Sequence, residues 1–401
     1  MSFTTCSLRV AAHNGAVLVL DAGTTGVKAF VFDGECKILA KAYKQISKTR
    51  PQTGWVEQDP REIVRASLAV MRQAVKKSGL EAKQIRGFGI TNQREATIVW
   101  NKRTGKPIYP VIGWEDARTK ALCRTIDKTD GKKIRELTGL PVDSYFSATK
   151  IRWMLDHVPT KQPLAFGTID SWLLYNLCND RPHVTDETNA SRTLLFNIRT
   201  RRFDDQLLHT FDVPRDLLPT VLPSRAAFGV LDKKILGTRI PVVAVCGDQQ
   251  SSLYAASRAR GVGARTTKIT YGTGSFVMQN VGKKFLFHPP FFTTLTPGIR
   301  GTDFAVETKV EGSAMKVAGL LQNPKGLKTY LHALAKKIDQ SIQQLPTKPS
   351  MIVADGGVAR DGIVVEEQQK ISDVRVCLQQ TFDGTALGTA LLVWDALDQK
   401  L

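Results

Sequence analysis

The stretch "LDAGTTGVKAF", Leu20 to Phe30, decides the fold. It completes an apolar run, residues 17–20, that is typical of a buried strand, and "AFVFD" begins a second strand almost at once. The residues between them, Gly23 to Gly26, are predicted to form a tight hairpin, because glycine tolerates a positive φ. Backbone N–H groups, two hydroxyls and a carboxylate at one hairpin tip suit a polyphosphate with its cation. A polar turn with nothing bound is the alternative for this stretch taken alone.

The composition is that of an ordinary globular protein with a basic surface. The chain has 401 residues, of which 42% are hydrophobic and 23% charged, and no run of 18 apolar residues that would span a membrane. The formal net charge is +19. Basic runs such as "RTRR", ending at Arg202, are short and lack interleaved aromatic residues. We therefore expect a solvated basic surface and no nucleic-acid partner.

The cysteines and the N-terminal segment bear on the compartment. The six cysteines are scattered, and no pair has metal-ligand spacing or suggests a disulfide framework. This usage fits a reducing compartment, so we expect a cytoplasmic protein. Residues 1–15 lack the apolar core of a secretory signal and are predicted to be a disordered extension. An organelle address, mitochondrial or peroxisome-like, is the alternative, and it rests on the composition of this segment and on the terminal "QKL".

The same order of elements occurs twice along the chain. Three strands are predicted between residues 17 and 46, and a helix follows them. This helix begins after the N-cap Asp59, has Glu62 as a capping-box partner and ends at Gly79. The next predicted strand is "IRGFGIT". The second half repeats strands, helices and a strand, with a Gly-Thr-Gly turn at residues 272–274. This repetition predicts two α/β lobes, each with a phosphate-type turn, and a nucleotide in the cleft between them.

Other segments place polar or aromatic side chains at strand ends. "GITNQREAT" puts Arg94 and Glu95 after an apolar strand, where they are either hydroxyl ligands of a polyol or a surface ion pair. "VVAVCGDQQ" puts Asp248 at the start of a helix, as an N-cap or as a general base at a cleft. Trp114 and Tyr145 are either core residues or walls of a ligand site.

Together these segments resemble the glycerol kinase branch of the FGGY carbohydrate kinases, which share the actin-like ATPase fold. The matching blocks run in the family's order and include "LDAGTTGVKAF", "ITNQREAT", "TNASRT", "GDQQSSLY", "TYGTGSF" and "ADGGVARDG". The resemblance implies two actin-like/ribonuclease H-like lobes. The N-terminal lobe, residues 16–247, would carry the polyol and the first phosphate loop, and the C-terminal lobe, residues 248–401, the nucleotide side.

The resemblance also implies ATP-dependent phosphorylation of glycerol to sn-glycerol 3-phosphate, with ATP and Mg²⁺ as cofactors. Asp248 would be the catalytic base, and Asp21 and Asp248 would hold the metal ion. The residues implied to bind the polyol are Arg94, Glu95, Trp114, Tyr145, Asp248, Gln249 and Phe276. The residues implied to bind the nucleotide are Thr24, Thr25, Gly26, Lys28, Gly272, Thr273, Gly319, Gln322, Gly357 and Asp361.

The chain departs from the family's pattern in several places. Gly26 and Val27 stand where serines are usual, and Lys28 replaces an arginine. Asp361 replaces an adenine-side asparagine, which predicts weakened ATP binding because a carboxylate cannot donate a hydrogen bond. A block between residues 322 and 326 is missing relative to the family. The alternatives are therefore another sugar or polyol kinase of the family, or a nucleotide-binding protein that has lost activity. Whether the chain forms a homodimer or a homotetramer is left open.

Overall fold

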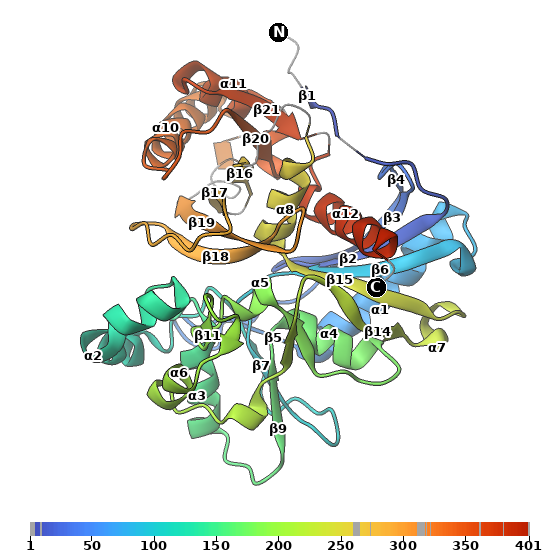
Figure 1. The fold of residues 1–401 in the computed structure, drawn as a ribbon, viewed down its shortest axis with the longest axis vertical. Coiled ribbons are helices and arrows are strands. Elements are labelled where there is room, and N and C mark those ends of the chain that lie inside the picture. Colours follow the sequence, from blue (N-terminus) through green and yellow to red (C-terminus); the bar gives the residue numbers. More distant parts are fainter. Residues whose placement is uncertain are drawn as a thin grey trace. The chain divides into compact units, whose positions relative to one another are not determined.

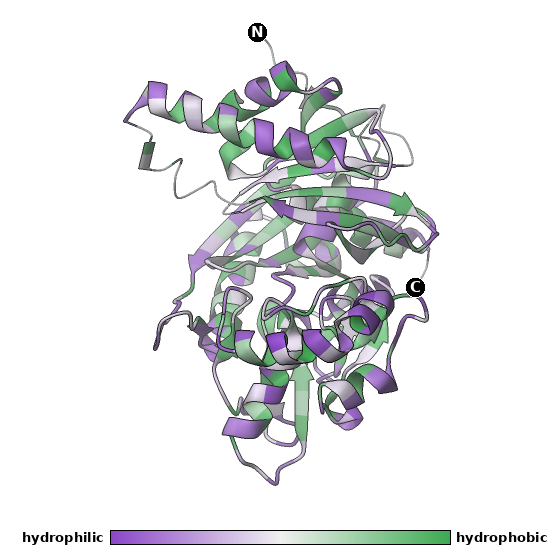
Figure 2. Cartoon of the chain, turned by 90° about the vertical axis from the view of Figure 1, so that its left-hand side faces the viewer, coloured by the Kyte–Doolittle hydropathy of each residue, from purple (hydrophilic) through white to green (hydrophobic). Residues whose placement is uncertain are grey.

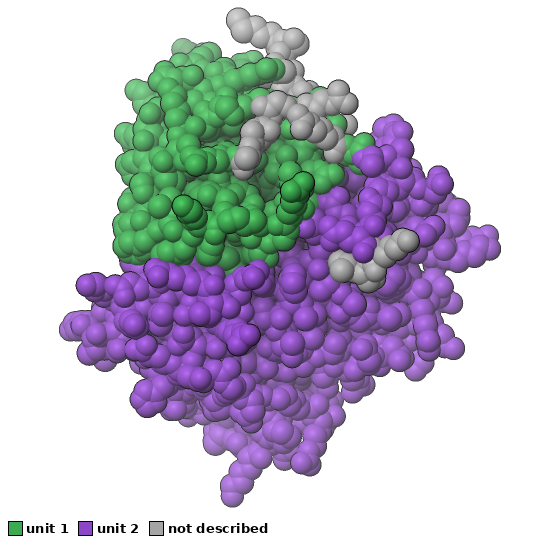
Figure 3. Space-filling model, in the orientation of Figure 1, with its two compact units in different colours: residues 1–10, 249–388 green, residues 11–248, 389–401 purple. Residues whose placement is uncertain are grey.

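The fold is built from two compact units. A computed structural model of the chain describes residues 5–8, 10–259, 265–272, 274–310, 317, 319–320, 322–360, 362–379 and 381–399. Unit 1 contains Met1–Val10 and Gln249–Gly388, and unit 2 contains Ala11–Asp248 and Thr389–Leu401 (Figure 3). The division after Asp248 differs by one residue from the boundary expected from the sequence. The terminal segments also differ from that expectation, because Met1–Val10 is grouped with the unit of Gln249–Gly388 and Thr389–Leu401 with the unit of Ala11–Asp248.

Unit 2 is organised around a six-stranded mixed sheet (Figure 1). Its strands, in spatial order, are β14 (Arg225–Leu231), β15 (Ile240–Gly247), β6 (Ile85–Asn92), β2 (Ala16–Ala22), β3 (Gly26–Asp33) and β4 (Ile38–Gln45). The helices of this unit are α1 (Pro60–Ser78), α2 (Lys120–Thr138), α3 (Ser147–His157), α4 (Ile169–Leu177), α5 (Glu187–Ala190), α6 (Asp205–Thr210) and α7 (Lys233–Leu236). Its smaller strand pairs are β5 (Glu57–Gln58) with β8 (Val111–Ile112), β7 (Ile98–Asn101) with β9 (Leu164–Gly167), β10 (Val184–Asp186) with β13 (Thr220–Leu222), and β11 (Phe196–Asn197) with β12 (Arg202–Phe203).

Helix α1 begins and ends where the sequence predicts. The Asp59 side chain accepts a hydrogen bond from the backbone N–H of Arg61, and Gly79 closes the helix with φ of 71°. The predicted capping box is wrong, because Glu62 instead accepts hydrogen bonds from the backbone and hydroxyl of Ser47. The apolar stripe of α1, which includes Ile63, joins the core against one face of the sheet together with residues of α4.

The last helix, α12 (Gly384–Asp398), packs closely against β6 through its second half. A Cβ added at Gly89 would lie 2.6 Å from side-chain atoms of both Thr389 and Val393. A Cβ at Gly87 would meet Val393 at 2.9 Å. The "GFG" of the predicted strand is therefore explained by helix packing, because any larger residue would push α12 away from the sheet.

Unit 1 repeats this plan around a seven-stranded sheet. Its strands, in spatial order, are β1 (Thr5–Cys6), β21 (Arg375–Gln379), β20 (Met351–Asp355), β16 (Thr267–Tyr271), β17 (Ser275–Gly282), β19 (Thr302–Val310) and β18 (Phe292–Pro297). Helices α10 (Pro324–Gln343) and α11 (Ile363–Ile371) supply the core on one face of this sheet. Helix α8 (Asp248–Ser257) packs on other sheet residues, with Leu253 against Met278 and Ala305. Hydrophobic and hydrophilic residues alternate along α10, as expected for a helix buried on one side (Figure 2).

The predicted duplication is confirmed by the sheet topology. In unit 2, β2, β3 and β4 pair antiparallel in sequence, and β6 lies parallel to β2 on its other side. In unit 1, β16 and β17 pair antiparallel and β20 lies parallel to β16 in the same way. The difference is that unit 1 has a fourth strand in this antiparallel part, β19, which lies between β17 and β18.

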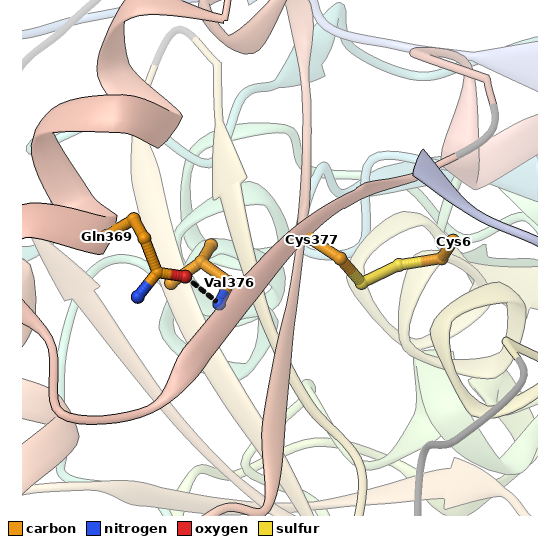
Figure 4. Close-up of a disulfide and its surroundings, with 4 residues drawn as sticks. All are labelled: Cys6, Gln369, Val376 and Cys377. Carbon is orange, nitrogen blue, oxygen red and sulfur yellow. Dashed lines mark hydrogen bonds between the residues drawn. A yellow bond between two sulfur atoms is a disulfide. The ribbon is translucent and has the colours of Figure 1, made fainter. Parts of the chain in front are cut away.

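The N-terminal segment is joined to unit 1 by a disulfide between Cys6 and Cys377 (Figure 4). Strand β1 pairs parallel with β21, with Cys6 opposite Gln379, although residues 1–15 were expected to be disordered. The expectation that no disulfide forms is wrong for this pair. The two cysteines are 371 residues apart, and only the strand pairing brings them together, so spacing rules could not detect them. Beside the disulfide, the backbone N–H of Val376 donates to Gln369 Oε1 at 2.7 Å (Figure 4).

Among the described residues, no helix has both the length and the apolar character needed to cross a membrane.

Candidate functional site

The candidate site residues of unit 2 gather at one edge of its sheet. Strands β2, β6 and β15 are parallel, and the register places Asp21 opposite Thr91 and Thr91 opposite Cys246. Parallel strands present their carboxyl ends at the same edge. Asp21, Arg94 and Asp248 therefore all leave the sheet at this edge, as the sequence interpretation required.

Arg94, Glu95 and Asp248 form a charge cluster in that edge. Arg94 Nε lies 3.3 Å from Asp248 Oδ1 and 3.6 Å from Glu95 Oε1. The side chains of Arg94 and Glu95 are each only 2% exposed, whereas that of Asp248 is 32% exposed. The alternative of a surface ion pair is therefore wrong, since buried charges persist only when they are paired. Asp248 combines a fixed position with access from solvent, which is what a proton acceptor needs.

Arg192 is a member of this cluster that sequence reasoning did not assign. Its Nε donates to Glu95 Oε1 at 2.6 Å, and its side chain is fully buried. The guanidinium also lies over the rings of Tyr145, at 5.6 Å, and Phe146, at 5.1 Å. The block "TNASRT" contains it, but only the fold shows that this arginine holds the Glu95 carboxylate.

Lys150 is a second unassigned cation. Its ammonium donates to the backbone carbonyls of Glu95, at 3.0 Å, and Tyr145, at 2.9 Å, and its side chain is fully buried. Burial lowers the pKa of Lys150 to about 8, an effect that the Glu95 carboxylate partly opposes. Lys150 thus ties together two segments that each carry a predicted polyol ligand. A lysine in a helix is usually solvated, so no local pattern could indicate this position.

The predicted hairpin forms at residues 23–26, but the expected reason is wrong, because neither Gly23 nor Gly26 has a positive φ. The Gly23 N–H donates to the Gly26 carbonyl at 3.1 Å, and Lys28 Nζ lies 3.9 Å from Asp21 Oδ2. A Cβ at the departure Gly26 would lie 2.3 Å from the ring of the exposed Tyr43, so that ring would have to shift to admit a serine. The hairpin therefore keeps its backbone N–H groups and the hydroxyls of its two threonines, although it lacks the serine usual at residue 26.

Trp114 and Tyr145 lie together beside this hairpin. Their rings pack edge to face at 5.5 Å, and the Trp114 indole N–H donates to Thr24 Oγ1 at 2.9 Å. Both side chains are half-buried. Neither ring is a fully enclosed core residue, and the assignment of both as walls of a ligand site stays a prediction.

In unit 1, Gln249 belongs to a buried polar network. Lys268 Nζ donates to Gln249 Oε1 at 2.8 Å and to the Thr270 hydroxyl, which in turn donates to Asp355 Oδ1 at 2.6 Å. The Ser252 hydroxyl donates to the other oxygen of Asp355. This network joins the start of α8 to the end of β20, and Lys268 and Asp355 were not predicted as members of any site.

Two glycine turns predicted on the nucleotide side also lie in unit 1. Gly356 has φ of 98°, and a Cβ there would lie 2.4 Å from the Tyr271 carbonyl oxygen, so no other residue fits. A Cβ at the following Gly357 would meet nothing within 4 Å, which leaves its backbone open to a ligand. The Gly272 N–H donates to the Gly274 carbonyl at 3.3 Å in the other turn. Phe276 follows that turn in β17 and is buried.

The other four predicted nucleotide ligands of unit 1 lie apart from these described turns or outside the described residues. Gly319 and Gln322 are exposed, Gly319 in a helical turn and Gln322 in the turn before α10. Thr273 and Asp361 lie outside the described residues.

Magnesium binding by Asp21 and Asp248 at the unit 2 edge stays a prediction. Among the residues that the structure describes, no group of three or more histidine, cysteine, aspartate or glutamate side chains could hold a metal ion by itself. Mg²⁺ commonly needs only one or two carboxylates and completes its shell with water and substrate phosphates. The carboxylates of Asp21 and Asp248, at the ends of parallel strands in one sheet, match that requirement.

Comparisons with known proteins agree on one family. The model of the FGGY family of carbohydrate kinases, N-terminal domain, matches residues 16–255. A glycerol kinase of Burkholderia multivorans is 43% identical over 313 residues, which cover 76% of this chain and 62% of the relative. A glycerol kinase of Delftia acidovorans is 46% identical over 276 residues, which cover 67% of this chain and 55% of the relative. The chain thus spans 55–62% of the length of these curated relatives.

Solved structures match over almost the whole chain. The glycerol kinase of Plasmodium falciparum with ADP has a TM-score of 0.87 at 24% identity, over 98% of this chain and 91% of that one. A ligand-bound xylulose kinase of Lactobacillus acidophilus has a TM-score of 0.84 at 16% identity, over 96% and 90% of the two chains. These matches confirm the expected α/β fold, and at such identities they indicate the fold alone.

Proposed function

Since the chain belongs to the FGGY family of carbohydrate kinases, we propose that it transfers the γ-phosphoryl group of ATP to glycerol and forms sn-glycerol 3-phosphate. The observation that carries this proposal is the cluster of Arg94, Glu95 and Asp248, in which the buried Arg94 guanidinium contacts both the buried Glu95 carboxylate and the Asp248 carboxylate, which solvent can reach. The names of the curated relatives support glycerol as the acceptor.

The cluster supplies the groups that a polyol acceptor requires. Asp248 accepts the proton of a terminal hydroxyl, whose oxygen forms the new bond to phosphorus while the bond from phosphorus to the ADP oxygen breaks. Arg94 donates hydrogen bonds to hydroxyls and Glu95 accepts them. Trp114 and Tyr145 offer apolar faces to the carbon chain. On unit 1, we assign Gln249 and Phe276 to the polyol from the sequence resemblance.

The hairpin at residues 23–26 is assigned to the phosphates of ATP. Its backbone N–H groups, the hydroxyls of Thr24 and Thr25, and the ammonium of Lys28 are the donors that bind a polyphosphate. Mg²⁺ held by Asp21 and Asp248 would neutralise phosphate charge, which is the main requirement of phosphoryl transfer. On unit 1, we assign the nucleotide to the turns at Gly272 and Gly357.

The proposal is tested by measuring ADP release from ATP and Mg²⁺ with glycerol, dihydroxyacetone, xylulose or gluconate as the acceptor. We expect the largest kcat/KM for glycerol and only background release without an acceptor. A larger kcat/KM for a sugar than for glycerol would show that the chain has another activity of the family. Stabilisation by ATP without turnover of any acceptor would indicate a nucleotide-binding protein that has lost its activity.

A further inference from the structure

Thr24, at the tip of the phosphate hairpin, is held by two side chains from outside the hairpin. The Trp114 indole N–H donates to its hydroxyl oxygen at 2.9 Å, and Gln58 Nε2 donates to its backbone carbonyl, also at 2.9 Å. Gln58 is itself fixed, because its Oε1 accepts from Gln93 Nε2 at 2.9 Å. All four residues belong to unit 2.

Both contacts lead back to the polyol ligands. Gln93 directly precedes Arg94 and Glu95 in the chain. Trp114 packs edge to face on Tyr145, over which the guanidinium of Arg192 lies while its Nε binds Glu95. A chain of buried or half-buried contacts therefore joins Thr24, which is assigned to the phosphates, to Glu95 and Tyr145, which are assigned to the acceptor.

The hydrogen bond from Trp114 also restricts the Thr24 hydroxyl. A hydroxyl has one donor hydrogen and two acceptor positions, and its hydrogen rotates to suit its neighbours. An indole N–H can only donate, so it occupies one acceptor position and directs the O–H away from itself. A hydroxyl held in this way is preorganised to donate to an anion at the hairpin tip.

We propose that Trp114 is a positioning residue for phosphoryl transfer as well as a wall of the acceptor site: it orients the Thr24 hydroxyl toward a phosphate of ATP. The proposal rests on the proposed function, which assigns Trp114 to the polyol and Thr24 to the phosphates of ATP.

A double-mutant cycle tests this role. Trp114→Phe keeps an aromatic wall and removes the indole N–H, and Thr24→Val removes the hydroxyl with little change of volume. The wild type, both single variants and the double variant are compared by kcat/KM for ATP at saturating glycerol. Trp153→Phe is the matched control, because it removes an indole that packs on Trp55 in the same unit, and thermal unfolding checks the fold of every variant.

We expect Trp114→Phe to lower kcat/KM for ATP about twofold to tenfold, which is the effect of one hydrogen bond. In the Thr24→Val background the same substitution should cause no further loss, because the hydroxyl that it orients is already absent. The control should match the wild type. An equal loss in both backgrounds, or a loss confined to the KM for glycerol, would overturn the proposal.

Calorimetric titration of the same four proteins with ATP and Mg²⁺ separates this proposal from the proposed function. If glycerol is not phosphorylated, a loss of ATP affinity on Trp114→Phe that disappears in the Thr24→Val background still supports the positioning role. Additive losses of affinity contradict it, as does a wild type that binds no ATP.

Discussion

Arg94 Nε lies 3.3 Å from Asp248 Oδ1, so the candidate base is held by a buried guanidinium within its own unit. The two residues leave parallel strands, β6 and β15, whose pairing brings Gly247 opposite Asn92. The base therefore owes its position to the sheet and does not depend on a bound acceptor.

Asp248→Asn should abolish most turnover and leave the fold intact. The amide keeps the shape of the side chain but accepts no proton, and loss of a general base costs about 10²–10⁴-fold in rate. The measurement is kcat for glycerol phosphorylation, with ATP affinity determined by calorimetry. A variant with normal kcat would remove Asp248 from the assigned role.

Glu95→Gln should weaken acceptor use much more than ATP use. The carboxylate accepts a 2.6 Å hydrogen bond from Arg192 and lies beside Arg94, and the amide leaves two buried guanidinium groups poorly paired. Hydrogen bonds to charged groups contribute about 1.5–3 kcal/mol, so kcat/KM for glycerol should fall about tenfold to a hundredfold. Glu81→Gln, on an exposed ion pair with Lys83, is the control. Equal losses for glycerol and ATP would contradict the polyol assignment.

Lys150→Met should raise the KM for glycerol with little change in the KM for ATP. It removes the hydrogen bonds that hold the carbonyls of Glu95 and Tyr145 at 3.0 and 2.9 Å, so both ligand segments lose a common anchor. Lys150→Arg, which keeps a donor, should recover part of the loss. A purely structural lysine would instead change the unfolding temperature and leave both KM values as they are.

The lowered pKa of Lys150 also leads to a prediction of how the unfolding free energy depends on pH. Its pKa is about 8 in the folded chain, below the ordinary 10.5, so between these values the unfolded chain binds more protons. The contribution of Lys150 to the unfolding free energy should therefore rise as the pH rises from 8 to 10.5. The difference in unfolding free energy between wild type and Lys150→Met should grow over this window. A constant difference for Lys150→Met would show that the ammonium is not buried.

The local features of the fold could be predicted from the sequence, since their causes are local. Asp59 and Gly79 bound α1 because a cap acts on neighbouring backbone groups. Gly23 and Gly26 mark a hairpin because turns depend on a few adjacent residues. The sequence blocks that place Asp21, Arg94 and Asp248 at the ends of apolar runs also predict the sheet edge that holds the candidate site, because each block is a local pattern.

The supporting residues could not be predicted, because tertiary contacts decide them. Lys150 and Arg192 look like ordinary surface cations in the sequence, yet the fold buries both against Glu95. Cys6 and Cys377 meet only through the pairing of β1 with β21. The position of β19 between β17 and β18 depends likewise on strand pairing that no local pattern contains.

The disulfide gives a further prediction about the N-terminal segment. Under non-reducing alkylation, peptides containing Cys6 and Cys377 should be recovered linked, with Cys36, Cys123, Cys178 and Cys246 recovered outside any disulfide. Cys6→Ser should lower stability under oxidising conditions, by about 2–4 kcal/mol for a typical disulfide, and should equal the wild type once dithiothreitol is added. Recovery of both peptides unlinked from oxidised protein would contradict the bond.

The central claim is that this chain phosphorylates glycerol with Asp248 as the base. Its most direct test incubates the purified wild type and the Asp248→Asn variant with ATP, Mg²⁺ and glycerol. Formation of sn-glycerol 3-phosphate is followed with a stereospecific dehydrogenase. We predict that the wild type forms this product in a ratio of one to the ADP released, while the variant forms about 10²–10⁴-fold less per unit time. ADP release by the wild type without sn-glycerol 3-phosphate, or equal product from both proteins, would contradict the account.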